Sequence, residues 1–314
     1  MTKTRVLVLD PIHADGLAML AARDDIALTH LPAPEEDDIL AHMAVAEALL
    51  LRGRHLSRQA FERAANLRLI SRHGVGCDNL DLDAFRARNV RVAISADANW
   101  LSVAEHTLAL MFAAAKALHA GDRAVRDGNW AVRDALGTRE IAGSDVLVIG
   151  FGRIGRAVAE RCATLGARVS VHDPAIAETP PFAAAPSLPD AMAAADFITL
   201  HVPRLPETLG LIGADLLARL RPGAILVNTA RGGIVDEAAV LHALDHGPLA
   251  RYATDVLADE PPGAGDPLLS RSDVILTPHS AAMTAEAARR MATGAAQNIL
   301  DFLDGRLAPE MTVV

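Results

Sequence analysis

Residues 145–161 read DVLVIGFGRIGRAVAER, the most informative segment of the chain. The apolar run 146–149 predicts a strand, and the residues after it place Gly150, Gly152 and Gly155 at the spacing G-x-G-x-x-G. The residues that follow carry apolar side chains at helical spacing. A strand, a tight turn and a helix in this order are typical of the unit that opens a doubly wound α/β sheet.

The glycine turn predicts a dinucleotide site. Gly150 permits the tight turn, Gly152 lets a pyrophosphate approach the backbone, and Gly155 lets the helix pack on the strand. The helix N-terminus offers free N–H groups and the positive end of the helix dipole to the phosphates. Asp173 ends the next apolar run, RVSVHD, eighteen positions after Gly155. There its carboxylate can accept hydrogen bonds from a ribose diol and repel a 2′-phosphate, so we expect NAD rather than NADP. The alternative is that the glycine-rich turn binds no ligand.

Bulk properties narrow the classes of protein. The 314 residues predict two domains, and 51% hydrophobic with 22% charged residues is an ordinary globular balance. A net charge of −9 argues against a nucleic-acid partner. We expect neither a signal peptide nor a segment that spans a membrane. Two cysteines, Cys77 and Cys162, are too few for a disulfide framework, so we expect a reducing compartment such as the cytoplasm. We also expect no bound metal.

Two series of alternating strands and helices predict an α/β fold with parallel sheets. The strands expected in the first series are 5–10, 26–31, 46–53, 67–74 and 90–95. Those expected in the second are 145–149, 168–173, 196–203, 224–230, 251–256 and 273–278. One long helix is expected between the two series, over 103–126, with Ser102 and Glu105 as its capping box.

Three ionisable residues follow the glycine loop near expected strand ends: Arg231, Glu260 and His279. Hydride transfer at a carbinol carbon requires a proton to move at its oxygen, which histidine does well near neutral pH. A carboxylate such as Glu260 would orient the imidazole and stabilise its charged form. Arginine suits a substrate carboxylate. Taken singly, each residue also fits a surface pair, a solvated turn or a loop histidine.

The chain resembles the D-isomer-specific 2-hydroxyacid dehydrogenases, the family of phosphoglycerate dehydrogenase, hydroxypyruvate reductase and glyoxylate reductase. The matching segments, in order, are LLLRG (49–53), HGVGCDNLDLDA (73–84), NWLSVAEHTLALM (99–111), the glycine loop, HVPRLPETLGLIG (201–213), LRPGAILVNTARGGIVDEAAV (220–240), DVLADEPP (255–262) and LTPHSA (276–281). The resemblance implies an NAD-dependent interconversion of a small 2-oxoacid and its D-2-hydroxyacid, with catalytic Arg231, Glu260 and His279.

The resemblance also assigns binding residues. It implies cofactor contacts from Gly150, Gly152, Arg153, Ile154, Gly155, Asp173, Val202, Pro203, Thr208, Thr229, Ala230, Asp255 and His279. It implies substrate contacts from Arg52, Val75, Gly76, Asn99 and Arg231.

The family architecture is interrupted. It implies two Rossmann-like doubly wound parallel-sheet domains, with the cofactor domain, 99–282, inserted into a substrate domain built from 1–98 and 283–314. It also implies a homodimer formed through the cofactor domain.

Several alternatives stay open at this point. We rank hydroxypyruvate or glyoxylate above the phosphorylated substrate of D-3-phosphoglycerate dehydrogenase, because the N-terminal loops offer only Arg52, Arg54 and Arg72 as candidate phosphate ligands. An NAD-sensing co-repressor with the same fold is an alternative of another class, although the complete Arg–Glu–His set argues for turnover. Glu260 argues against formate dehydrogenase, where the resemblance implies glutamine. The sequence assigns no role to His73, Cys77 or Trp100.

Overall fold

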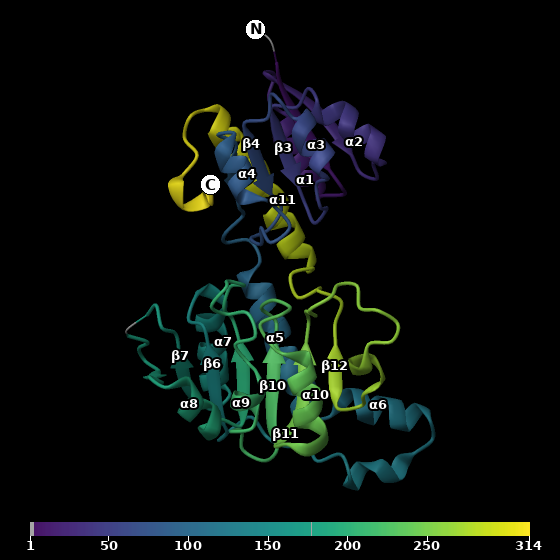
Figure 1. The fold of residues 1–314 in the computed structure, drawn as a ribbon, viewed down its shortest axis with the longest axis vertical. Helices are drawn as coiled ribbons and strands as arrows, with labels where there is room; N and C mark the ends of the chain where they lie inside the picture. Colours follow the sequence, from purple (N-terminus) through teal and green to yellow (C-terminus); the bar gives the residue numbers. More distant parts are fainter. Residues whose placement is uncertain (1–2, 177) are drawn as a thin grey trace. The chain divides into compact units, whose positions relative to one another are not determined.

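The structure is a computed structural model that describes residues 3–176 and 178–314. The chain forms two compact units, Met1–Asn99 with Met283–Val314, and Trp100–Ala282 (Figure 1). Each unit is built on one all-parallel sheet with helices on both faces. The predicted fold class is confirmed: two doubly wound α/β units, with the second inserted into the first.

The first unit has a five-stranded sheet in the order β2-β1-β3-β4-β5. The strands are β1 (Thr4–Leu9), β2 (Ile26–Leu31), β3 (Ala48–Leu51), β4 (Leu69–Arg72) and β5 (Arg91–Ala93). This order, 2-1-3-4-5, is a common doubly wound arrangement whose strand order reverses between β1 and β3. The C-terminal tail lies along the β5 edge, where the Val92 N–H donates to Val314 O at 3.2 Å and the Val313 N–H to Val92 O at 2.9 Å.

Alternate residues of β1 face opposite sides of this sheet, as the period of a strand requires. Leu7 and Leu9 pack in one apolar cluster, and Val6 and Val8 in the other. Helices α2 (Glu36–Met43), α3 (Arg58–Arg63) and α4 (Leu82–Ala87) cover the first face, and α1 (Ala14–Ala21) and α11 (Ala285–Leu303) the second. Because both faces are covered, β3 reads as an uninterrupted apolar run, ALLL.

The second unit has a seven-stranded sheet in the order β12-β11-β10-β9-β6-β7-β8. The strands are β6 (Asp145–Ile149), β7 (Arg168–His172), β8 (Ala183–Ala184), β9 (Phe197–Leu200), β10 (Ala224–Asn228), β11 (Leu249–Thr254) and β12 (Val274–Leu276). Counted from β6, this is the order 3-2-1-4-5-6 of dinucleotide-binding sheets with one further strand. The two-residue strand β8 was missed by the sequence analysis, because two alanines carry no strand pattern.

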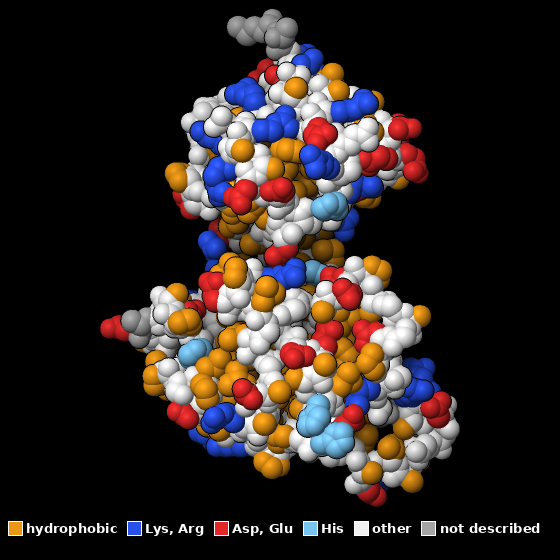
Figure 2. Space-filling model, viewed as in Figure 1, with side chains coloured by type: hydrophobic (Ala, Val, Ile, Leu, Met, Phe, Trp, Pro, Cys, Tyr) orange, Lys and Arg blue, Asp and Glu red, His pale blue; other side chains and the backbone are white. Residues whose placement is uncertain are grey.

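Two apolar clusters cover the faces of this sheet. Helices α5 (Trp100–Ala115) and α7 (Arg153–Thr164) pack on one face, and α8 (Leu188–Ala194), α9 (Ala214–Leu217) and α10 (Glu237–His246) on the other. Acidic and basic side chains are interspersed over the visible surface of both units (Figure 2).

The prediction of one long helix over 103–126 is wrong. Helix α5 begins at Trp100, so Ser102 lies inside the helix, buried, and cannot be its N-terminal cap. The helix ends at Ala115, and Ala117 has a left-handed backbone with φ 49°. A second helix, α6 (Leu118–Arg126), then runs at 58° to the first, and a 3-10 turn, η1 (Trp130–Asp134), follows it.

Among residues 3–176 and 178–314, no single helix has the length and apolar character needed to cross a bilayer; only α5 and α6 taken together, with their bend, reach that threshold.

Candidate active site

Six of the predicted site residues follow six strands of the seven-stranded sheet. Gly150 comes directly after β6, Asp173 after β7, Thr229 after β10 and Asp255 after β11, while Val202 follows β9 by two residues and His279 follows β12 by three. Because all these strands are parallel, their carboxyl ends form one edge of the sheet. This edge is where doubly wound sheets bind ligands.

The glycine loop has the geometry that a pyrophosphate site requires. Gly150 has φ +92°, and a Cβ there would come within 2.5 Å of the carbonyl oxygen of His201. A Cβ on Gly155 would overlap the carbonyl oxygen of Gly150, so α7 packs directly on the turn. Gly152 is the N-cap of α7, and a Cβ there would meet nothing within 4 Å. The space over Gly152 and the N–H groups of Arg153 and Ile154 therefore suit the phosphates.

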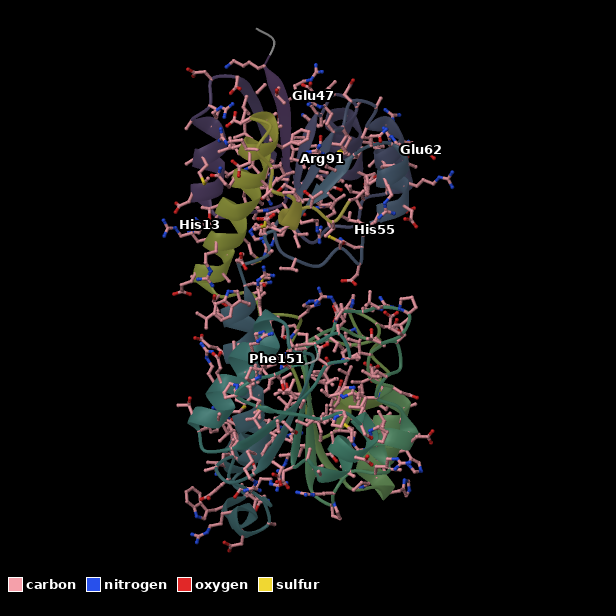
Figure 3. The ribbon with its side chains drawn as sticks, turned by 90° about the vertical axis from the view of Figure 1, so that its left-hand side faces the viewer. His13, Glu47, His55, Glu62, Arg91 and Phe151 are labelled. Atoms are coloured by element: carbon pink, nitrogen blue, oxygen red, sulfur yellow. The ribbon has the colours of Figure 1, made fainter. Side chains whose placement is uncertain are left out.

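The side chain of Asp173 faces this loop from the end of β7. Its Oδ2 accepts a hydrogen bond from the Phe151 N–H at 2.7 Å, and its Oδ1 accepts one from the Ala175 N–H at 2.9 Å. Phe151, labelled in Figure 3, follows β6 by two residues and belongs to the second unit. A carboxylate has about four acceptor positions, so two remain for a ribose diol.

Glu260 and His279 form a pair. The Nδ1 of His279 lies 2.7 Å from Oε2 of Glu260, and Oε1 of Glu260 accepts a hydrogen bond from the Leu257 N–H at 2.9 Å. Because a carboxylate only accepts, the proton between them sits on Nδ1, which leaves Nε2 to exchange a proton with a substrate. The side chains are 52% (His279) and 37% (Glu260) exposed, so both are open to solvent.

Arg231 follows β10 and is partly buried. Its guanidinium donates to the carbonyl oxygen of Ala230 at 2.7 Å, and its own carbonyl oxygen accepts a hydrogen bond from Asn228 Nδ2 at 3.1 Å. Asn228 also accepts from the Ala230 N–H through its side-chain oxygen, so it fixes the turn that carries Arg231.

The other predicted cofactor residues lie on the same loops. The Thr229 side chain is buried and its hydroxyl lies 2.7 Å from the Thr107 hydroxyl. The Thr208 hydroxyl spans its loop, donating to Pro203 O at 2.6 Å and accepting from the Leu205 N–H at 2.8 Å. The Asp255 carboxylate is only 1% exposed.

His201 also follows β9. Burial lowers the pKa of His201 to about 3, and its Nε2 lies 3.0 Å from the Thr199 hydroxyl. A neutral imidazole adds no charge to this strand end.

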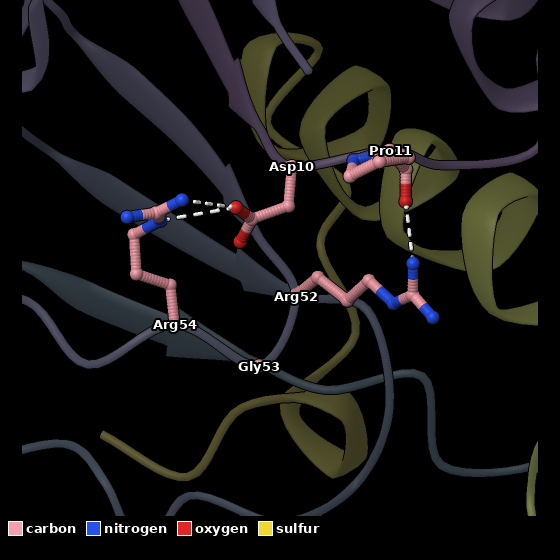
Figure 4. A pocket seen from close by; sticks show the side chains of 5 residues that line it. All are labelled: Asp10, Pro11, Arg52, Gly53 and Arg54. Atoms are coloured by element: carbon pink, nitrogen blue, oxygen red, sulfur yellow. Dashed lines mark hydrogen bonds and ion pairs between the residues drawn. The ribbon is translucent and has the colours of Figure 1, made fainter. Parts of the chain in front are cut away.

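The predicted substrate residues other than Arg231 belong to the first unit. Arg52 follows β3 and donates to Pro11 O at 2.9 Å. Arg54 pairs with Asp10 at 2.9 Å. Asp10, Pro11, Arg52, Gly53 and Arg54 line an open cavity of about 360 Å³ (Figure 4). The cavity lies at the carboxyl ends of β1 and β3, where the strand order reverses.

The turn after β4 holds Val75 and Gly76. Val75 is 37% exposed, which leaves this turn accessible. Arg72 is buried, and both its Nε and Nη2 donate to Gly76 O, at 3.1 and 3.0 Å. Arg72 therefore supports the turn. Asn99 is the last residue of this part of the first unit and is partly buried.

Two residues that support the site were missed. Glu237 in α10 accepts a hydrogen bond from the Ala258 N–H at 2.8 Å and so holds the loop that carries Glu260; burial raises the pKa of its carboxyl. His106 in α5 lies 3.0 Å from the Thr277 hydroxyl. The only sequence signal for either was a polar residue at a helix position beside a predicted site segment. In the described part of the chain, no group of three or more His, Cys, Asp or Glu side chains could hold a metal ion.

Comparison with known proteins shows the family to which the chain belongs. Residues 108–281 match the family described as D-isomer specific 2-hydroxyacid dehydrogenase, NAD binding domain. The chain is 40% identical over 312 residues to D-3-phosphoglycerate dehydrogenase of Mycobacterium tuberculosis, covering 97% of this chain and 58% of that protein. The chain thus spans somewhat more than half the length of such curated relatives.

Two solved structures have the same architecture. NAD-dependent formate dehydrogenase from Staphylococcus aureus, in complex with NAD, is 28% identical with a TM-score of 0.88, and the match covers 99% of each chain. NADPH-dependent glyoxylate/hydroxypyruvate reductase from Sinorhizobium meliloti is 26% identical with a TM-score of 0.87, and the match covers 99% of this chain and 98% of that one.

Proposed function

The chain belongs to the D-isomer-specific 2-hydroxyacid dehydrogenase family, and from this premise we propose that it is an NAD-dependent dehydrogenase acting on D-3-phosphoglycerate. The main support for this substrate is the 40% identity, along 97% of the chain, to a D-3-phosphoglycerate dehydrogenase. This reverses the ranking that the sequence analysis gave to hydroxypyruvate and glyoxylate.

The cofactor is NAD, and the residues present fit it. Open space over Gly152, the N-terminus of α7 and the free acceptor positions of Asp173 match the pyrophosphate and the ribose diol. When bound, NAD accepts or supplies the hydride.

His279 and Glu260 move the proton at the substrate oxygen. In the direction of oxoacid reduction, the charged imidazole donates its Nε2 proton to the carbonyl oxygen. In the reverse direction, neutral Nε2 takes the proton from the hydroxyl group. The Glu260 carboxylate lies 2.7 Å from Nδ1 of His279 and keeps the ring oriented. Arg231 anchors the substrate carboxylate, as a planar guanidinium does best.

A phosphorylated substrate needs cationic groups in addition to Arg231. Arg52 and Arg54 line the same cavity at the end of β3, and Asp10 neutralises Arg54 in the resting protein. A phosphate group, with its greater charge, competes with Asp10 for Arg54. Val75, Gly76 and Asn99 remain proposed substrate-binding residues of the first unit.

Steady-state kinetics test this proposal. We expect kcat/KM with NADH to be at least about tenfold higher for 3-phosphohydroxypyruvate than for hydroxypyruvate, since a charge-assisted hydrogen bond contributes roughly 1.5–3 kcal/mol. Arg54→Gln should remove that preference and leave hydroxypyruvate reduction unchanged. Arg58→Gln, which removes an exposed ion-paired arginine of α3, is the matched control. A wild-type preference for hydroxypyruvate would contradict the phosphorylated substrate, and no turnover of any 2-oxoacid would favour a sensor without catalysis.

We further propose a homodimer formed through the second unit. Helix α6 and η1 carry apolar side chains on their surface: Leu118 is 56% exposed, Val125 52% and Trp130 70%. Exposed apolar groups gathered on one segment are typical of an interface. Two free cysteines are in keeping with a cytoplasmic location, which we also propose.

A further inference from the structure

The loop that carries His279 is held in an unusual conformation. His279 has φ +51°, a left-handed backbone that residues with a Cβ seldom adopt. Its side chain is 52% exposed, so packing of the imidazole does not hold the loop. Its backbone N–H donates to Asp255 O at 2.8 Å, which is the first of several bonds between this loop and Asp255.

The Asp255 carboxylate fastens the loop on both sides of His279. It accepts hydrogen bonds from the Thr277 hydroxyl at 2.6 Å, the Ser280 N–H at 2.8 Å and the Ala281 N–H at 2.8 Å. The side chain is 1% exposed, and a buried carboxylate is stable only while such donors surround it. The position of the His279 backbone therefore depends on this set of donors staying together.

His106, which lies outside this loop, contacts Thr277, one of the donors to Asp255. Its Nε2 lies 3.0 Å from the Thr277 hydroxyl oxygen and 3.6 Å from Asp255 Oδ1. A threonine hydroxyl has one proton, and at 2.6 Å that proton goes to Asp255. The Thr277 oxygen must then accept, so His106 carries a proton on Nε2 and donates it. This fixes one rotamer of Thr277.

The turn of α5 that carries His106 is held in place by its neighbours. The next residue, Thr107, is fully buried and lies 2.7 Å from the hydroxyl of Thr229 at the end of β10. Hydrogen bonds at two successive residues tie this turn of α5 to the carboxyl edge of the sheet.

We infer that His106 is a positioning residue for His279, acting through Thr277 and the buried Asp255 carboxylate. The inference rests on the proposed role of His279 in proton transfer. Without the His106 donor, Thr277 can leave Asp255, and the loop loses one of the bonds that hold the imidazole in place.

Four variants test the kinetic consequence: His106→Ala, His106→Gln, Thr277→Val and the double variant of His106→Ala with Thr277→Val. Misplaced catalytic groups cost up to about 10²-fold, so we expect His106→Ala to lower kcat about tenfold with KM changed less than about twofold. Thr277→Val should do the same, and the double variant should be no worse than either, because both act in one chain of bonds. His106→Gln, whose Nε2 can donate in the same place, should restore kcat. The control is His242→Ala, an exposed histidine of α10. An unchanged kcat in His106→Ala, or a loss confined to KM, would overturn the inference.

Amide hydrogen exchange gives a readout that needs no turnover. In the resting protein, His106→Ala should speed the exchange of the Ser280 and Ala281 N–H groups at least about tenfold, while His106→Gln should not. If the wild type reduced no 2-oxoacid, the proposed function would fail, and the exchange data would still decide whether His106 holds the loop. Unchanged exchange in His106→Ala would overturn the inference in either case.

Discussion

His279 is the residue on which the proposed chemistry depends most directly. Its Nδ1 is committed to Glu260, so only Nε2 can exchange a proton with substrate. We expect His279→Ala to lower kcat by roughly 10²-fold or more, the usual contribution of a general acid–base group. Binding of NADH, followed by its fluorescence, should persist, because the glycine loop and Asp173 are untouched. Equal kcat in wild type and variant would contradict the assignment.

Buried histidines should make stability depend on pH. Burial, with a smaller contribution from the charge of Arg52, lowers the pKa of His73 to about 4, against an ordinary 6.5. Between these pH values the unfolded chain binds a proton at His73 that the folded chain does not bind. The contribution of His73 to the free energy of unfolding is therefore complete above about pH 6.5 and decreases as the pH falls toward 4. The loss due to His73 is about 3 kcal/mol at 1.36 kcal/mol per pKa unit.

His73→Leu, which removes the titrating group and keeps an apolar side chain, should flatten this dependence. The measurement is the free energy of urea unfolding at several pH values between 7 and 4. His201, whose pKa burial lowers to about 3, adds a loss of the same sign, so part of the slope should remain. His242→Ala serves as the control for the removal of an exposed histidine. A slope as steep in His73→Leu as in wild type would refute the prediction.

Within the turn from β6 to α7, one glycine is required for folding and another for cofactor binding. A Cβ on Gly155 would overlap Gly150 O, whereas one on Gly152 would meet open space at φ −73°. Gly155→Ala should therefore lower the melting temperature of the second unit sharply, since backbone must shift in the core. Gly152→Ala should fold with little change in melting temperature and bind NADH at least about tenfold more weakly, because its methyl group occupies the proposed phosphate space. Calorimetry and NADH titration check the pair, and normal NADH affinity in Gly152→Ala would rule out the pyrophosphate position.

The break between α5 and α6 has a tertiary cause. The sequence there, AAAKALHAG, contains strong helix formers and predicts continuation. In the structure, however, Arg251 Nη1 donates to Ala114 O at 3.0 Å and the Arg139 N–H donates to Ala115 O at 2.9 Å. These bonds satisfy the last carbonyl groups of α5, so the helix can end, and Ala117 turns the chain into α6.

At the scale of the whole molecule, the exposed segment α6–η1 predicts self-association. Trp130→Glu, at a residue 70% exposed, should convert a dimer to a monomer in sedimentation velocity, because a charge in an apolar interface is costly. Val45→Glu, an exposed apolar position of the first unit, is the control. A monomeric wild type, or a dimer unaffected by Trp130→Glu, would contradict the proposed interface.

Local patterns in the sequence were enough to predict the two parallel-sheet units and the cofactor NAD, and the family resemblance added the insertion. Apolar runs of strand length alternate with helices, and three glycines follow β6 at fixed spacing. The sequence also named Glu260 and His279, which the structure brings to 2.7 Å. Strands and tight turns are specified by residues that are neighbours in the chain.

Features that depend on residues far apart in the sequence became visible only in the folded chain. His106 contacts Thr277, 171 positions away, and Arg72 supports the turn at Gly76. Arg251 bonds the last turn of α5, where the residues of the helix alone would predict that it continues. Asp255 shows the same division: the sequence placed it at a strand end, but its three donors come from a loop 22 to 26 positions later. A hydrogen bond depends on the place and direction of both partners, and for distant residues the packing of the sheet and its helices fixes these.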